Sequence, residues 1–147
     1  MVRFVKFPNG TEIRAASLSE RRENDEWRGF GLYLDAAWHP SWHSHVLGWE
    51  DFGLPSSPTQ AVDEILSAYM RARAGEHVEV GCKGGLGRTG TVIACMAFLA
   101  GVAPEEAVTW VRRNYDQDAV ETREQEQWVL WFAAEVGRRD RLAEVGR

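Results

Sequence analysis

Residues 80–90 of this 147-residue chain, VGCKGGLGRTG, place one cysteine and one arginine at the two ends of a glycine-rich loop. Three of the five residues between Cys82 and Arg88 are glycine, so the backbone N–H groups can turn inward around a bound anion without steric penalty. We expect Arg88 to open a helix, where the helix dipole and the planar guanidinium both favour a phosphate. The same positive charges favour a thiolate on Cys82, which predicts a nucleophile inside a phosphate-binding loop.

Two further segments accompany this loop. Residues 49–55 upstream read WEDFGLP, and residues 120–125 downstream read VETREQ. With the pattern cysteine, five residues, Arg-Thr-Gly, they resemble the cysteine-dependent protein-tyrosine and dual-specificity phosphatases over about residues 45 to 130. In that family the first segment is the mobile general-acid loop, and the last positions the hydrolytic water. A P-loop nucleoside triphosphatase is excluded, because its motif ends in Gly-Lys-Ser/Thr and this loop ends in Gly-Arg-Thr.

The resemblance implies a role for each matched residue. Cys82 attacks phosphorus and forms a phosphocysteine, while Asp51 protonates the leaving oxygen. Asp51 then deprotonates the hydrolytic water, which Gln125 orients, and the Thr89 hydroxyl donates to the departing thiolate. No metal and no cofactor is required, because the loop supplies the positive field itself. The phosphate is held by the Arg88 guanidinium and by the loop N–H groups of Lys83, Gly84, Gly85, Leu86, Gly87 and Arg88.

We therefore expect a metal-independent phosphomonoester hydrolase that acts on phosphotyrosine or with dual specificity on phosphoproteins. Its binding partner is a phosphorylated protein or a small phosphomonoester. One alternative is a catalytically weak phospholigand-binding module of the same fold, which two departures from the family pattern favour. Gly81 stands where most members have histidine, and Glu50 replaces the proline of the acid loop. A second alternative is a sulfur-transfer enzyme of the rhodanese type, which also uses a cysteine in an anion-holding loop. Such an enzyme needs neither the acid loop nor the glutamine loop, so this alternative ranks last.

Some of these residues also have a local interpretation. Aspartate is a normal turn residue, so Asp51 also fits a turn before Phe52-Gly53. If Asp51 is misplaced, Glu50 is the substitute general acid. Gln125 forms a possible capping box with Thr122 at a helix start. Glu121 is interpreted as a loop-orienting group. The expected wall of the substrate pocket lies between residues 19 and 42, with the aromatic residues Trp27, Tyr33, Trp38 and Trp42.

Composition restricts the class of partner and the compartment. A net charge of −5 argues against a nucleic-acid or anionic-membrane partner, because both need a broad basic face. With 44% hydrophobic and 27% charged residues, the chain suits one globular domain. No apolar run approaches the roughly 18 residues that cross a bilayer, and the first residues lack a signal-peptide core, so we expect a cytoplasmic protein. The two cysteines, Cys82 and Cys95, fit a reducing compartment and are not expected to form a bridge.

The pattern along the chain alternates strands and helices. Residues 2–7 and 11–16 flank an Asn-Gly turn that indicates a hairpin, and residues 30–35, 45–49 and 77–80 indicate further strands. Helices are expected to start at Ser57-Pro58, Arg88, Pro104 and Thr122, the last reaching about residue 136.

These elements predict an α/β class, and the resemblance implies a protein-tyrosine-phosphatase-like fold. We expect a central, mostly parallel sheet flanked by helices on both faces, with the site at its carboxyl edge. Residues 1–147 form a single domain in this prediction. Within it, residues 1–44 form the N-terminal hairpin and substrate-side loops, residues 45–136 the catalytic core, and residues 137–147 a charged tail.

Overall fold

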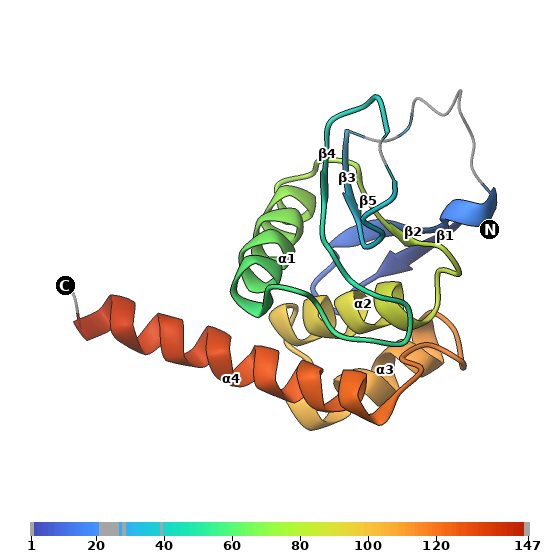
Figure 1. Cartoon of the computed structure of the whole chain (residues 1–147). Helices are drawn as coiled ribbons and strands as arrows, with labels where there is room; N and C mark the ends of the chain where they lie inside the picture. Colours follow the sequence, from blue (N-terminus) through green and yellow to red (C-terminus); the bar gives the residue numbers. More distant parts are fainter. Residues whose placement is uncertain (1, 21–26, 28, 39, 146–147) are drawn as a thin grey trace.

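The computed structural model describes residues 2–20, 27, 29–38 and 40–145 of the chain (Figure 1). Within these residues, one sheet has the strand order β1-β2-β5-β3-β4. β1 is antiparallel to β2, and the pairs β2–β5, β5–β3 and β3–β4 are parallel. The α/β class and the mostly parallel central sheet are therefore confirmed. The strands are β1 (Val2–Lys6), β2 (Glu12–Ser17), β3 (Phe30–Tyr33), β4 (Ser44–Val46) and β5 (Val78–Cys82).

The hairpin of β1 and β2 forms where the Asn-Gly turn predicts it. Gly10 has a φ of 90°, which a residue with a side chain rarely adopts, and the Asn9 side chain accepts a hydrogen bond from the N–H of Thr11 at 3.1 Å. The hairpin sets the register of β2, whose last residue, Ser17, pairs with Cys82 at the end of β5. Both strands consequently end at the same edge of the sheet, next to the loop that follows Cys82.

The helices begin close to the expected residues. They are α1 (Pro58–Arg73), α2 (Gly87–Leu99), α3 (Ala107–Asn114) and α4 (Arg123–Val145), with the short 3-10 turns η1 (Leu18–Glu20) and η2 (Pro104–Glu106). Ser57 caps α1, because its hydroxyl accepts a hydrogen bond from the N–H of Gln60 at 3.4 Å. None of the helices in the described ranges is both long enough and apolar enough to cross a bilayer.

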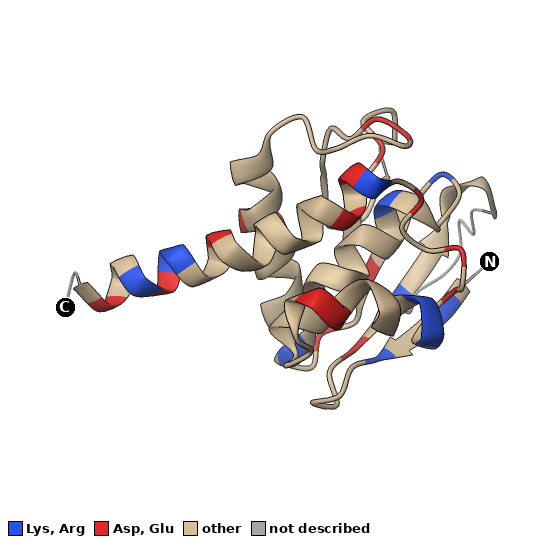
Figure 2. Cartoon of the chain, turned by 90° about the horizontal axis from the view of Figure 1, so that it is seen from below, with Lys and Arg blue, Asp and Glu red and all other residues tan. Residues whose placement is uncertain are grey.

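Helix α4 continues through the segment expected as a charged tail. Figure 1 shows its C-terminal turns extending away from the rest of the domain, and Figure 2 shows basic and acidic residues alternating along them. Arg138 donates to the Glu135 carboxylate at 2.7 Å, and Arg139 pairs with Asp63 of α1 at 2.5 Å. The Glu135–Arg138 pair joins neighbouring turns of α4 and favours the helical conformation, whereas the Arg139–Asp63 pair ties α4 to α1, so the charges prolong the helix instead of ending it.

The two faces of the sheet differ in character. Apolar side chains of the strands join those of α1 and α2 in the core: Ile13, Ala15, Phe30, Leu32, Val78 and Val80. Side chains alternate along a strand, so Arg14, Tyr33 and Glu79 lie on the opposite face. There Glu79 accepts hydrogen bonds from Arg14 at 2.8 Å and from the Tyr33 hydroxyl at 2.7 Å, and Trp42 donates to that hydroxyl at 2.8 Å. In the described part of the chain, Trp38 and Trp42 of the connection between β3 and β4 lie against Tyr33 on this face, and Trp27 lies against Arg14.

Candidate active site

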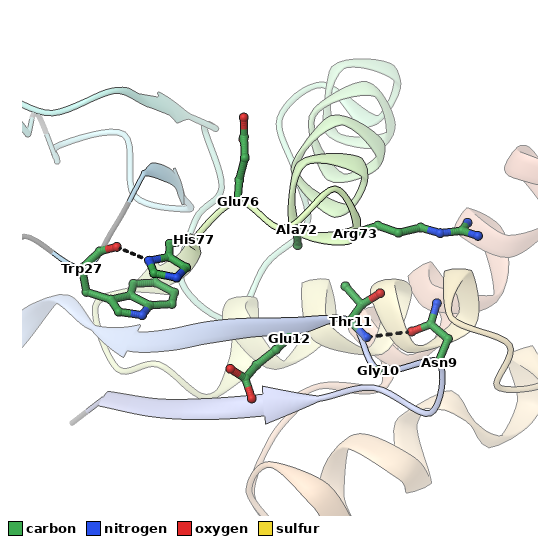
Figure 3. A pocket seen from close by; sticks show the side chains of 10 residues that line it. Asn9, Gly10, Thr11, Glu12, Trp27, Ala72, Arg73, Glu76 and His77 are labelled. Carbon is green, nitrogen blue, oxygen red and sulfur yellow. Dashed lines mark hydrogen bonds between the residues drawn. The ribbon is translucent and has the colours of Figure 1, made fainter.

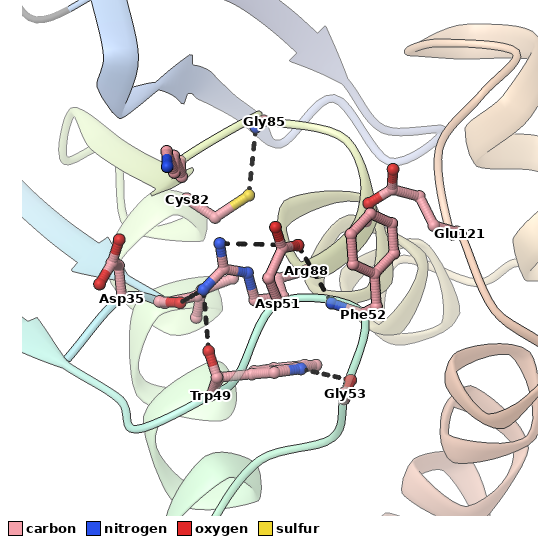
Figure 4. Close-up of polar contacts among 12 residues, drawn as sticks. Asp35, Trp49, Asp51, Phe52, Gly53, Cys82, Gly85, Arg88 and Glu121 are labelled. Carbon is pink, nitrogen blue, oxygen red and sulfur yellow. Dashed lines mark hydrogen bonds and ion pairs between the residues drawn. The ribbon is translucent and has the colours of Figure 1, made fainter.

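The glycine-rich loop leaves the carboxyl end of β5 and wraps around the thiol of Cys82 (Figure 4). Cys82 is only 2% exposed, and it is a free cysteine. The N–H of Gly85 donates to its sulfur at 3.2 Å. Gly85 has a φ of 76°, a conformation that side chains disfavour, so the glycine permits the turn that directs this N–H at the sulfur. The predicted nucleophile therefore lies inside the loop, with a backbone donor pointing at it.

Arg88, the second residue of α2, is buried, and its guanidinium is anchored through Nη1. Its Nη1 donates to the carbonyl oxygens of Leu34 and Trp49, each at 2.8 Å. Its Nη2 lies 3.8 Å from the Asp51 carboxylate, and its buried Nε has no hydrogen-bond partner among the described residues. The Nε and Nη2 edge of a guanidinium is the edge that binds two oxygens side by side. The anchoring at Nη1 leaves this edge available for a phosphate.

The hydroxyl of Thr89 is a second buried donor at this site. Thr89 has no exposed surface, and within the described ranges its Oγ1 has no hydrogen-bond partner. Thr91, two residues further on, behaves differently, since its hydroxyl donates to the Gly87 carbonyl at 2.7 Å. A buried hydroxyl in the first turn of α2, left without a protein acceptor in the described structure, is consistent with the predicted donation to a thiolate.

The acid loop is closed by its own hydrogen bonds. Trp49 pairs with Pro55 as an isolated bridge, and its indole N–H donates to the Gly53 carbonyl at 2.8 Å. Phe52 has a φ of 60° and donates its N–H to the Asp51 carboxylate at 3.0 Å. The turn interpretation of Asp51 and the acid interpretation are therefore compatible, because the turn presents its carboxylate to Arg88 with 53% of the side chain exposed.

A cavity of about 350 Å³ is lined by Asp51, Cys82 and four of the six predicted phosphate-loop residues, and it adds one carboxyl, whereas Gly85, Arg88 and Thr89 do not line it. Glu50 does not line it, whereas Glu121 does, and Glu121 is thus the carboxyl that neighbours Asp51 here. It comes from the loop before α4, and no spacing in the sequence brings that loop to the start of α2. The residues that line the cavity are Ser19, Asp51, Phe52, Cys82, Lys83, Gly84, Leu86, Gly87 and Glu121.

Glu121 lies directly over the first residue of α2. A Cβ added to Gly87 would be 2.0 Å from its Oε1, so a larger residue there would require the Glu121 carboxylate to move. Burial raises the pKa of the Glu121 carboxyl above its usual value, and the charge of Asp51 adds to this effect. Arg88 and the N–H of Gly87 act in the opposite direction. Glu121 therefore holds its proton to a higher pH than an ordinary glutamate.

Gln125 occupies the helix cap that the sequence allows. Its Oε1 accepts from the N–H groups of Glu121 at 2.8 Å and Thr122 at 3.3 Å, while its own N–H donates to the Thr122 hydroxyl at 3.1 Å. Its Nε2 donates to the Gly53 carbonyl at 3.2 Å, which ties α4 to the acid loop. Gln125 does not line the cavity in this arrangement, and its water-orienting role stays a prediction.

The aromatic residues expected to form the pocket wall lie elsewhere. Tyr33, Trp38 and Trp42 pack against one another, and Trp27 stacks on His77 with ring centroids 4.4 Å apart. Within the described ranges, Phe52 is the aromatic side chain at the cavity. The rest of the expected wall, at residues 21–26, 28 and 39, lies outside the described residues.

A larger hollow, of about 560 Å³, lies at the other end of β5 (Figure 3). His77, just before the strand, lines it, whereas Cys82 ends the strand at the opposite edge. Among the described residues that line the hollow there is neither a cysteine nor a buried donor without a partner, so the loop cavity is the candidate active site. The residues lining the hollow are Asn9, Gly10, Thr11, Glu12, Trp27, Ala72, Arg73, Gly75, Glu76 and His77.

The mostly parallel sheet ends in a loop that surrounds the buried Cys82 thiol, and the buried Arg88 directly follows that loop. This arrangement agrees with the phosphatase class that the loop motif predicts. The family described as "Swiss Army Knife protein, DSP-PTPase phosphatase domain" matches residues 40–129. The chain belongs to this family of phosphatase domains.

Individual proteins resemble this chain in sequence or in fold. An uncharacterised protein of Methanocaldococcus jannaschii is 43% identical over 84 residues, which cover 56% of this chain and 54% of that protein. The chain thus spans about half the length of the curated relatives it matches first. A glycine-to-alanine mutant form of Tk-PTP has a TM-score of 0.65 at 25% identity, covering 90% of this chain and 96% of that one. Kinase associated phosphatase, with its catalytic cysteine replaced by serine, has a TM-score of 0.70 at 13% identity, covering 92% and 96%.

Proposed function

We propose that this protein is a metal-independent phosphomonoester hydrolase that works through a phosphocysteine intermediate on Cys82. The observation that supports the proposal is a pair of buried donors, the Nε of Arg88 and the hydroxyl of Thr89, which have no partners in the described structure and belong to the two residues directly after the loop around the buried Cys82 thiol. Leaving a buried donor unpaired costs about 1–3 kcal/mol. A bound phosphate at Arg88 and a thiolate at Thr89 supply the acceptors that these groups lack.

The reaction follows from the positions of these groups. The Cys82 sulfur attacks phosphorus, the bond from phosphorus to the leaving oxygen breaks, and Asp51 gives that oxygen a proton. A water molecule then attacks phosphorus, Asp51 takes its proton, and the bond between phosphorus and sulfur breaks to restore the thiolate. Arg88 and the loop N–H groups stabilise the charge of both transition states. Glu121, which keeps a proton to higher pH, is the second carboxyl in the same cavity.

The rim of the cavity supports an aryl phosphate substrate, as in phosphotyrosine. Phe52 lines the cavity and is 59% exposed, so one face of its ring can stack on a phenyl group. The same open rim admits phosphoserine and phosphothreonine, because Asp51 and Phe52 belong to an exposed turn. The substrate class that we propose is therefore a phosphoprotein, with phosphotyrosine or dual specificity.

The test is hydrolysis of an aryl phosphate, with a metal chelator present, by the wild type and by Cys82→Ala. Cys95→Ala is the matched control, because Cys95 is fully buried in α2 and burial raises the pKa of its thiol. We expect turnover by the wild type and Cys95→Ala and none by Cys82→Ala. Turnover by Cys82→Ala contradicts the phosphocysteine. Phosphate binding without turnover by the wild type favours the alternative, a phospholigand-binding module.

A further inference from the structure

The phosphate loop is held from outside at two of its carbonyl groups. The Lys83 carbonyl accepts a hydrogen bond from the Ser17 hydroxyl at 2.7 Å and from the N–H of Ser19 at 3.3 Å. The Gly85 carbonyl accepts a hydrogen bond from the hydroxyl of Tyr115. Ser17 ends β2 and Tyr115 directly follows α3, so two separate elements contact the loop at alternate residues.

These outward contacts determine where the loop donors point. In a trans peptide the C=O and the next N–H point in opposite directions. When the carbonyls of Lys83 and Gly85 turn outward, the N–H groups of Gly84 and Leu86 turn toward the inside of the loop. Gly84 and Leu86 both line the cavity. The two hydroxyls thus act on the orientation of two phosphate donors that they do not themselves touch.

The peptide between these two, Gly84–Gly85, directs its N–H at the Cys82 thiol. The N–H of Gly85 donates to the Cys82 sulfur at 3.2 Å, and its own carbonyl is the one that Tyr115 holds. Gly85 has a φ of 76°, and glycine alone imposes little preference for that conformation over others. A partner outside the loop is therefore needed to fix how the next peptide, Gly85–Leu86, is turned relative to this one, and the Tyr115 hydroxyl supplies it at the Gly85 carbonyl.

Tyr115 is itself fixed in place. Arg3 of β1 donates to the Tyr115 carbonyl at 2.6 Å, lies 5.7 Å from the centre of its ring, and pairs with Asp116 at 3.0 Å. Burial, followed by the effect of Cys82, raises the pKa of the Tyr115 hydroxyl above its usual value. The hydroxyl consequently remains protonated, and able to donate to Gly85, across the working range of a phosphatase.

We propose that Ser17 and Tyr115 are positioning residues, whose hydroxyls set the affinity of the loop for the phosphoryl group by turning the N–H groups of Gly84 and Leu86 inward. This inference rests on the proposed function of the loop. Ser17 lies outside the segment that matches the family, residues 40–129, and Tyr115 follows the arginine of the signature by 27 residues. The loop motif therefore depends on residues that the motif does not contain.

A purely structural role makes a different prediction, and the chain offers matched controls for it. Tyr69→Phe removes a buried tyrosine hydroxyl that accepts from the Asn9 amide at 2.7 Å, away from the loop. Ser57→Ala removes the cap of α1. If Ser17 and Tyr115 only stabilise the fold, their variants resemble these controls, with lower melting temperature and unchanged phosphate affinity well below melting.

The experiment measures how inorganic phosphate protects Cys82 from alkylation by iodoacetamide in the full chain. Cys95 is fully buried and does not interfere. For Tyr115→Phe and for Ser17→Ala, we expect the phosphate concentration for half protection to rise by about five- to tenfold, the equivalent of one hydrogen bond. The two controls should stay within about twofold of the wild type, a free-energy change smaller than that of an average hydrogen bond. In aryl phosphate hydrolysis, KM should rise more than kcat falls.

The outcomes separate this inference from the proposed function. Unchanged phosphate protection in Tyr115→Phe and Ser17→Ala overturns the positioning role, as does an equal loss in Tyr69→Phe and Ser57→Ala. A wild type that binds phosphate but does not hydrolyse an aryl phosphate overturns the proposed function, while the comparison of phosphate protection still decides the role of the two hydroxyls.

Discussion

Replacing Arg88 by lysine keeps one positive charge in the loop and removes the fork of donors. Nη1 makes two bonds of 2.8 Å to backbone carbonyls, those of Leu34 and Trp49, each worth about 1.5–3 kcal/mol as a hydrogen bond to a charged group. A single ammonium replaces one of them, so the free energy of unfolding should fall by about 1.5–3 kcal/mol. In a domain of this size, that lowers the melting temperature by about 5–10 °C.

The loss of activity should be larger than the loss of stability. The lysine cannot reproduce the Nε and Nη2 pair, and removing one transition-state donor costs about 10²–10³-fold in rate. We therefore expect kcat/KM for an aryl phosphate to fall by about 10²–10³-fold in Arg88→Lys, measured well below its melting temperature. Arg71→Lys is the control, because Arg71 pairs with Glu76 at 3.2 Å on α1, away from the loop. A kcat/KM within tenfold of the wild type in Arg88→Lys would refute the side-by-side binding of phosphate.

Two other substitutions test the surroundings of the loop. Burial and Asp51 raise the pKa of Glu121, so the folded state favours its protonated form, and stability from this source is present at low pH and lost as pH rises through that pKa. Thermal melts of Glu121→Gln across pH should lack this decline, and a melting profile identical to that of the wild type would contradict the raised pKa. Because Glu121 is the second carboxyl of the cavity, kcat for an aryl phosphate should also fall, and an unchanged kcat would contradict a share in proton transfer. In Gly81→His, a Cβ would lie 3.1 Å from a carbonyl oxygen of β2, so we expect about 1–3 kcal/mol lower stability by denaturant unfolding and no gain in activity. Gly137→Ala, whose added Cβ has its nearest neighbour at 3.5 Å, should fold normally.

Local elements followed from the sequence because short-range preferences produce them. The Asn-Gly turn required a positive φ at Gly10, and Ser57 was placed to cap α1. The end of α4 is different, since the sequence predicts a charged tail at residues 137–147 and the structure continues the helix to Val145. The pairing of these charges with Glu135 and Asp63 depends on the helix being formed and on α1 lying beside it. Sequence patterns contain the first kind of information and lack the second.

The sequence by itself determined the chemistry of this protein: a thiol, an arginine and a run of glycines, close enough along the chain to form one loop. Only the tertiary structure decided what surrounds that loop. It set Glu121 over Gly87, turned the Arg88 guanidinium onto two carbonyls, and joined Tyr115 to Gly85. The reason is physical, because a motif specifies which groups can react, whereas their orientation comes from contacts between residues far apart in the chain, and those contacts exist only once the sheet and helices have packed.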